Sequence, residues 1–119
     1  MDRRTLEART KKFHIDVIQL CQSMPRNAAG FETARQVIRS AGSVAANYRA
    51  TKRAKSKVDF IYKIQIVLEE ADESMYWLEI IDEAGLISNS EVKRLVKEAN
   101  ELTAIFAAVD KTAKKNPRS

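Results

Sequence analysis

The stretch from Ser43 to Glu79 reads SVAANYRATKRAKSKVDFIYKIQIVLEEADESMYWLE and decides the fold. Apolar residues recur three and four positions apart on both sides of a break near Lys55, which predicts two helices. Helices joined by so short a connection run antiparallel. The stretch is therefore predicted to form a helical hairpin, with a cationic block at its turn and an anionic block along its second helix.

The same helical periodicity continues on both sides of this hairpin. The predicted helices span about residues 2–24, 31–54, 57–84 and 89–113, and a basic tail covers residues 111–119. The loops between them are short, so each helix is expected to run antiparallel to the one before it. The predicted fold is all-α: a single domain, residues 1–119, built as an antiparallel up-down-up-down four-helix bundle.

Residue types that favour helix ends support these boundaries. A loop is predicted at residues 26–30. Ser56 with Asp59 resembles a capping box, and Ser88 with Glu91 is expected to cap the last helix. On the third helix the predicted core residues follow a heptad spacing: Ile61, Ile64, Leu68, Ala71, Met75 and Leu78.

The composition fits a small helical domain. With 3 Gly and 2 Pro in 119 residues, the chain has few turn formers. Its formal net charge of +5 permits a nucleic acid, the ribosome or an anionic membrane surface as partner. The lone Cys21 lies in an apolar helical stripe, which predicts a small buried side chain rather than a nucleophile. The sequence has no apolar signal core and no apolar run of about 18 residues, so a cytoplasmic location is expected.

The third helix carries a second apolar stripe, nearly opposite its core stripe. A bundle core needs one stripe per helix, and a second one with three aromatic residues would be a large exposed patch on a monomer. We therefore predict a subunit interface. Its predicted residues on this helix are Val58, Tyr62, Ile66, Glu69, Glu73, Tyr76, Trp77 and Ile80. The alternative is a patch that the N-terminal segment covers, or one that stays exposed.

Basic residues on the second helix suggest two different roles. Arg35 and Arg39 are assigned to the interface, where they are expected to meet carboxylates such as Glu69 and Glu73, within the hairpin or across subunits. The bases at the turn are predicted to contact phosphate, because the nine residues that contain them, 49–57, include no acid that could neutralise them locally. This nucleic-acid-binding set is Arg49, Lys52, Arg53, Lys55 and Lys57. The alternative is a solvated turn that contacts nothing.

No residue set in this sequence predicts catalysis. A di-iron bundle needs two Glu-x-x-His pairs, and the chain has 1 His. Arg9 and His14 match the R-x4-H spacing of a family of helical ribonucleases, but an i,i+5 pair lies about 140° apart on a helix. The acids of the third helix are more typical of a solvated or ion-paired face than of a cation site. We therefore expect a non-enzymatic protein with no cofactor, no metal and no membrane partner.

The hairpin resembles a known bacterial family. The pattern Ser43-Val-Ala-Ala-Asn47, a basic turn, Ser56-Lys-Val-Asp-Phe60, then Glu69-Glu-Ala-Asp-Glu-Ser74 and Trp77-Leu-Glu79 is similar to that of the 23S rRNA intervening-sequence proteins, also labelled S23 ribosomal proteins. The resemblance implies a cytoplasmic bacterial homopentamer of four-helix bundles. It extends to the accessory protein of diversity-generating retroelements, a basic pentamer that binds nucleic acid and reverse transcriptase. Many members have an acid-glycine pair where this chain has Ala50-Thr51, so the turn here is more cationic.

These observations lead to one functional hypothesis and one alternative. The hypothesis is an oligomeric bundle that binds nucleic acid, either RNA or a ribosome-associated site, through its basic turn. The alternative is a protein-interaction scaffold with an unidentified partner and no nucleic-acid role. Survival of partners after nuclease treatment would favour the scaffold.

Overall fold

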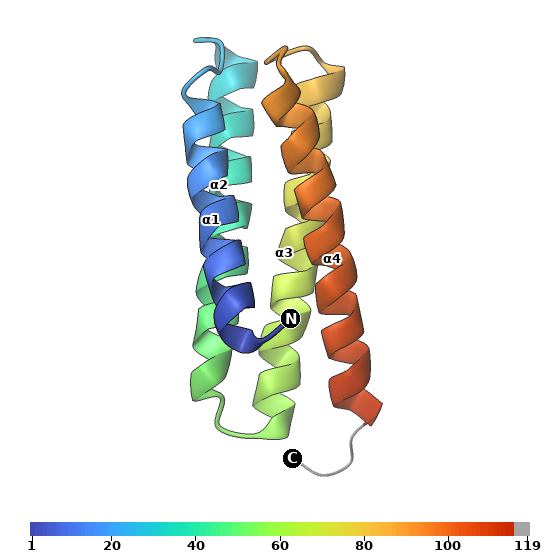
Figure 1. Ribbon diagram of the computed structural model, residues 1–119. Helices are drawn as coiled ribbons and strands as arrows, with labels where there is room; N and C mark the ends of the chain where they lie inside the picture. Colours follow the sequence, from blue (N-terminus) through green and yellow to red (C-terminus); the bar gives the residue numbers. More distant parts are fainter. Residues whose placement is uncertain (116–119) are drawn as a thin grey trace.

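The computed structural model describes residues 1–115, which form an antiparallel bundle of four α-helices (Figure 1). The helices are α1 (Arg3–Cys21), α2 (Ala28–Ala50), α3 (Lys57–Glu83) and α4 (Ser90–Lys115), with a short 3-10 helix, η1 (Thr51–Arg53), between α2 and α3. The molecule measures 50 × 21 × 20 Å. The predicted all-α up-down-up-down bundle is confirmed.

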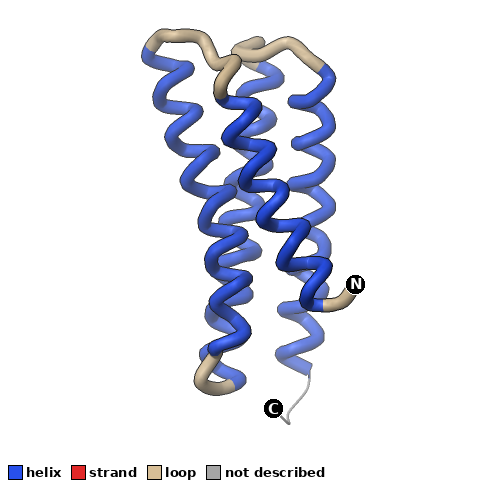
Figure 2. Tube along the Cα trace, turned by 60° about the vertical axis from the view of Figure 1, so that its left-hand side comes forward, coloured by secondary structure: helices blue, strands red, loops and turns tan. Residues whose placement is uncertain are grey.

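The helices pack in chain order around the bundle axis (Figure 2). α2 packs against both α1 and α3, α3 against α4, and α1 closes the bundle against α4 with a smaller contact. α1 has 19 residues, whereas α3 has 27 and α4 has 26. Since each residue adds about 1.5 Å, α1 is shorter than its neighbours, and its N-terminal end does not reach the level at which α2 turns into α3 (Figure 1). The end of the bundle at that level is built mainly by α2, α3 and α4.

Two helices begin at other residues than predicted because of side-chain caps. α2 begins at Ala28 rather than residue 31, since Asn27 Oδ1 accepts a hydrogen bond from Gly30 N at 2.8 Å. Only a glycine fits at position 30 in this first turn, because a Cβ there would stand 2.0 Å from the Pro25 carbonyl oxygen. α4 begins at Ser90, and its cap is Asn89 rather than Ser88: Asn89 Oδ1 accepts from the backbone N–H of Glu91 at 3.0 Å.

The other helix ends also shift by a few residues. α1 ends at Cys21 rather than 24, and the next residues form a turn. α2 ends at Ala50 rather than 54, because Thr51 Oγ1 donates to the Tyr48 carbonyl at 2.6 Å and the chain tightens into η1. α3 ends at Glu83, and Gly85 follows with φ 67°. Of the predicted basic tail, residues 111–115 continue α4, and residues 116–119 lie outside the described residues.

The capping box at the start of α3 is confirmed. Ser56 Oγ accepts from Asp59 N at 3.0 Å, and Asp59 Oδ2 accepts in return from Lys55 N at 2.9 Å. These bonds fix the direction in which the basic turn enters α3.

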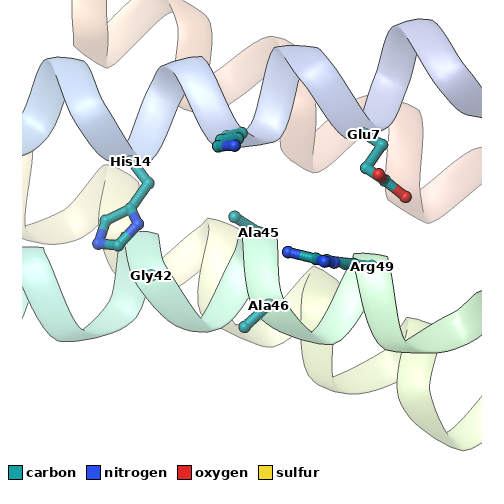
Figure 3. Close-up of a pocket in the computed structure, with 7 residues that line it drawn as sticks. Glu7, His14, Gly42, Ala45, Ala46 and Arg49 are labelled. Atoms are coloured by element: carbon teal, nitrogen blue, oxygen red, sulfur yellow. The ribbon is translucent and has the colours of Figure 1, made fainter.

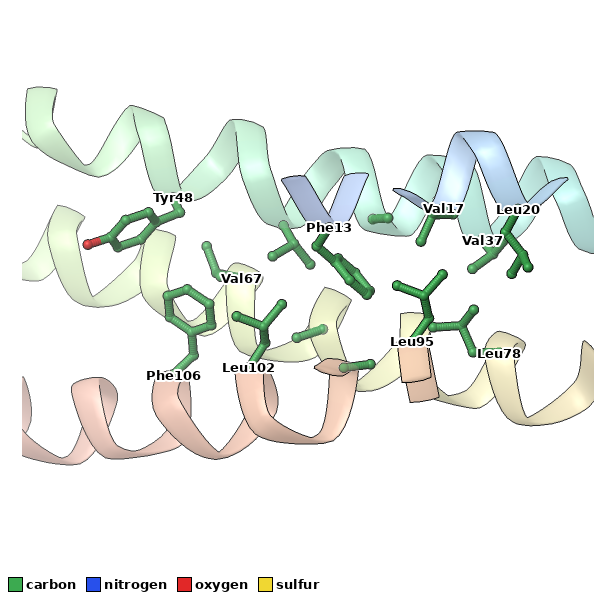
Figure 4. Close-up of a cluster of buried hydrophobic side chains, with 14 of the residues drawn as sticks. Phe13, Val17, Leu20, Val37, Tyr48, Val67, Leu78, Leu95, Leu102 and Phe106 are labelled. Atoms are coloured by element: carbon green, nitrogen blue, oxygen red, sulfur yellow. The ribbon is translucent and has the colours of Figure 1, made fainter. Parts of the chain in front are cut away.

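The core is a continuous apolar seam to which all four helices contribute (Figure 4). Its largest fully buried side chains include Phe13, Val37, Leu78, Leu95 and Phe106. On α3 the predicted seam was displaced by one residue at two levels. Val67 and Ser74 are fully buried, whereas Leu68 and Met75 are half-buried at its edge, as is Ile61.

The shift at Ser74 has a packing reason. Ser74 Oγ lies 2.9 Å from Ser40 Oγ on α2, and both hydroxyls also bond a backbone carbonyl one turn back on their own helix. Because both of these buried hydroxyls have partners, the polar pair is tolerated inside the core. Two small side chains at the same level allow α2 and α3 to approach closely.

Candidate nucleic-acid interface and subunit surface

Basic side chains gather at the end of the bundle where α2 turns into α3. Arg49, Lys52, Arg53 and Lys55 are exposed, and Lys57 is half-buried. We call this set together with the last turn of α4 the cationic end. The five predicted nucleic-acid-binding residues therefore do lie together on one end of the molecule.

The last turn of α4 adds bases that belong to the basic tail predicted from the sequence. Phe60 at the start of α3 and Val109 near the end of α4 line the same shallow apolar hollow, of about 390 Å³. The final residues of α4 therefore lie at this end of the bundle (Figure 1). They carry Lys111, Lys114 and Lys115. The antiparallel topology itself was the signal that could have placed them here.

Two bases of the cationic end have acid partners: Lys114 pairs with Asp110 one turn back on α4, at 2.9 Å, and Lys52 has a partner on another helix. Lys52 Nζ lies 3.4 Å from Glu7 Oε1 of α1, so the prediction that no acid approaches this turn was wrong for Lys52. The reason is tertiary, since α1 packs beside the end of α2. Within residues 1–115, Arg49, Arg53, Lys55 and Lys57 make no salt bridge.

The backbone of this turn is held from α1. Arg3 Nη2 donates to Thr51 Oγ1 at 2.7 Å, and the Arg3 guanidinium carbon lies 5.1 Å from the centroid of the Tyr48 ring. Tyr48 in turn packs on Phe106 of α4, with ring centroids 5.3 Å apart. Three helices thus fix η1, and the basic side chains project from a rigid support.

Arginines in the middle of the α2–α3 hairpin are used differently. Arg39 bonds Glu70 Oε2 at 3.0 Å and also pairs with Glu73, which raises the pKa of Arg39. Trp77 Nε1 donates to the same Glu73 carboxylate at 3.3 Å. Arg39 therefore ties α2 to α3 within one chain. Arg35 instead pairs along its own helix with Glu32, at 2.7 Å.

The outer face of α3 is apolar and aromatic, and it lies open. Val58 is 78% exposed, Tyr62 61% and Tyr76 53%. Glu69 is exposed among them. The half-buried members of the predicted interface are Ile66, Glu73, Trp77 and Ile80. Trp77 also packs edge-on against Tyr76, with centroids 5.1 Å apart.

A groove of about 450 Å³ runs between α1 and α2 (Figure 3). Its floor is made by small residues of α2, since Gly42, Ala45 and Ala46 line it. The remaining lining side chains are Glu7, Lys11, His14 and Arg49. His14 occupies the space that Gly42 leaves: a Cβ at Gly42 would stand 2.9 Å from His14 Nε2.

Arg9 and His14 point to different neighbours. Arg9 binds Glu98 through two hydrogen bonds of 2.6 and 2.8 Å and also reaches Glu101, both on α4, which raises its pKa. His14 packs against Gly42 of α2 instead. The R-x4-H pair does not converge within one chain.

Residues 1–115 contain neither a metal-binding cluster nor a helix that could span a membrane. Among residues 1–115, no three His, Cys, Asp or Glu side chains are grouped so as to hold a metal ion. Nor does any helix in that range combine the length and apolar character that crossing a bilayer requires. Burial raises the pKa of the Cys21 thiol to about 11, which keeps it protonated near neutral pH.

Comparison with models of protein families shows the family to which this chain belongs. The model of the 23S rRNA-intervening sequence proteins matches residues 6–108, nearly the whole bundle. The chain belongs to the 23S rRNA-intervening sequence protein family. Two of the motifs that carried the resemblance shape the hairpin locally: Asn47 Nδ2 donates to both Ser43 O and Ser43 Oγ at 2.9 Å, and Ser56 caps α3.

A solved structure supports the same assignment. The chain is similar to a protein of unknown function from the S23 ribosomal protein family of Bacteroides thetaiotaomicron, with 26% sequence identity and a TM-score of 0.83. The match covers 93% of this chain and 99% of that one. No curated protein matches this member of the family.

Proposed function

We propose that this family member is a non-enzymatic, oligomeric bundle that binds nucleic acid through its cationic end, either as RNA or at a ribosome-associated site. The observation that carries the proposal is the set of bases at that end without acid partners in the described chain, among them the exposed Arg53 and Lys55. Phosphate neutralisation by such bases supplies affinity without base-specific contacts.

The shape of this end supports backbone binding rather than base readout. The bases project from a helix end, a 3-10 turn and the last turn of α4, and an exposed stacking aromatic such as Tyr62 lies on the side of the bundle instead. Assembly into an oligomer would present several such ends together, and linked weak sites bind by effective concentration. The homopentamer that the family resemblance implied is part of this proposal.

The test is binding of a labelled RNA hairpin and of a DNA duplex at about 50 and 200 mM salt. We expect binding at low salt, and a loss of at least tenfold when Lys52, Arg53, Lys55 and Lys57 are all replaced by Ala. The matched control removes the same charge elsewhere, by replacing Lys12, Arg26, Lys93 and Lys97 with Ala. No binding at low salt, or equal losses in both variants, would reject the cationic end as the site.

A protein-interaction scaffold is the second candidate, because the exposed aromatic face of α3 is suited to docking a protein. A pull-down with and without nuclease separates the two. Partners lost after nuclease support nucleic-acid binding, and partners that survive support the scaffold.

A further inference from the structure

Two unlike surfaces lie on different faces of the bundle. The outer stripe of α3 is Val58, Tyr62, Ile66, Glu69, Tyr76 and Ile80. The other surface is the groove between α1 and α2 described above. Because α2 packs between α1 and α3, and α1 sits diagonally across from α3, the outer stripe of α3 and the α1–α2 groove lie on different faces of the bundle.

The two surfaces have opposite charge. From Ile64 to Val92 the chain contains no Lys or Arg, so the outer stripe of α3 is acidic as well as apolar. The groove carries Lys11, His14 and Arg49, and its one lining acid, Glu7, is already paired with Lys52. Apolar side chains are exposed on α1 as well, since Ile15 is 44% exposed and Ile18 38%.

The surfaces also match in height along the bundle. Arg39 of α2 pairs with Glu70 and Glu73 of antiparallel α3, and Ser40 contacts Ser74, so Gly42 is level with the stretch of α3 from about 67 to 72, which contains Glu69. Seven residues beyond Gly42 lies Arg49, and seven before Glu69 lies Tyr62. In the other direction the same step gives Arg35 and Tyr76. The series Arg35, Gly42, Arg49 on α2 is thus level, to within about one turn, with Tyr76, Glu69, Tyr62 on α3.

We propose that the outer stripe of α3 of one copy packs into the α1–α2 groove of a second copy. This inference rests on the oligomer of the proposed function and specifies its interface. A rotation about an axis parallel to the bundle, without translation, places Glu69 of one copy over the small α2 residues that form the groove floor of the other copy. There it lies beside Lys11 and His14 of α1. The same rotation stacks Tyr62 on Arg49 and Tyr76 on Arg35 as cation–π pairs. It assigns Arg49 to the subunit contact rather than to phosphate.

The charge pattern favours this head-to-tail contact over a symmetric one. In a two-fold dimer built on α3, Glu69 and Asp72 of one copy would face the same acids of the other, and like charges across an interface are unfavourable. A head-to-tail contact instead pairs acid with base. It generates a closed ring when the rotation carries no translation along the axis.

Cysteine cross-linking tests the contact directly. In a Cys21→Ala background, Lys11→Cys and Glu69→Cys variants are refolded separately and as a mixture, then oxidised briefly. Within one chain the two positions lie on diagonal helices and cannot meet, so a cross-linked dimer in the mixture alone is the expected result. A dimer from Glu69→Cys alone would overturn the proposal in favour of a symmetric contact. No cross-link in the mixture would also overturn it.

Charge exchange provides a second measurement on the same contact. By sedimentation at about 10 µM, Lys11→Glu and Glu69→Lys should each shift the protein toward monomer, and the double variant should restore the oligomer. A wild-type monomer, or no recovery in the double variant, contradicts the interface. If the interface fails while the cationic-end variant still loses RNA binding, the proposed function stands. If cross-links form but wild type binds no RNA at low salt, the function fails and the interface stands.

Discussion

The middle and the tip of the α2–α3 hairpin are both rich in arginine and lysine, yet the structure uses them in opposite ways. In the middle, Arg39 is held between Glu70 and Glu73 and joins two helices. At the tip, Arg53 and Lys55 are exposed and make no salt bridge within residues 1–115. The difference teaches that a basic residue on a helix acquires its role from what the neighbouring helix places beside it at that level.

The largest expected effect comes from reversing the charge of the tip. Replacing Lys52, Arg53 and Lys55 with Glu should weaken RNA binding at about 50 mM salt by 100-fold or more, because phosphate attraction becomes repulsion. The slope of log affinity against log salt should also become shallower, by roughly 0.7 per lost contact. Titration with a labelled RNA measures both. A triple reversal of Lys12, Arg26 and Lys97 is the control, and equal losses there would contradict a localised site.

The next effect concerns the close contact in the middle of the hairpin. Ser74→Leu places a larger side chain against buried Ser40 and should lower the free energy of unfolding by about 1–3 kcal/mol through overpacking. Urea denaturation followed by circular dichroism measures it. RNA binding of the folded fraction should be unchanged, because the tip lies several turns away. Wild-type stability in this variant would show that α2 and α3 are not tightly packed here.

A smaller effect is expected for the ion pairs of the middle. Arg39→Ala should cost about 0.5–1 kcal/mol of unfolding free energy, since the Arg39 side chain is 46% exposed and water weakens such pairs. The emission of Trp77 should shift as well, because its indole N–H bonds Glu73. Lys93→Ala, which loses a more exposed pair with Asp82, is the matched variant with a smaller expected cost. Tenfold weaker RNA binding in Arg39→Ala would contradict the claim that Arg39 is structural and that RNA binds only at the tip.

The smallest effect is a pH dependence of the one acid in the capping box at the tip. The Lys63 side chain, and then the Lys55 backbone N–H, hold the pKa of Asp59 below its usual value. Since this carboxylate has a lower pKa folded than unfolded, its stabilisation is present above about pH 4 and is lost as pH falls further. Asp59→Asn should therefore flatten the acid side of the unfolding curve between pH 2.5 and 5. Parallel curves for the two proteins would contradict this role.

Asp59 is an acid close to the tip, yet it forms no salt bridge with the basic side chains there. Its oxygens are committed to Lys63 at 2.7 Å and to the Lys55 backbone N–H, so the side chain of Lys55 remains free of it. The capping residues were readable in the sequence, because Ser followed by an acid three positions on is a local signal. Which groups the Asp59 carboxylate binds also depends on Lys63, which lies one helical turn after it on α3.

By itself, the sequence determined the helices, the antiparallel bundle and the second apolar face of α3, because helical periodicity and short loops are local properties. Tertiary structure alone decided which bases are paired. Lys52 meets Glu7 and Arg39 meets Glu70 because packing brings together residues far apart in the chain. It also decided that Val67 and Ser74, not Leu68 and Met75, fill the seam, and that Lys111, Lys114 and Lys115 join the cationic end. Rotation of a helix about its axis and the level of its neighbour are set by contacts among all four helices, so no single stretch of sequence encodes them.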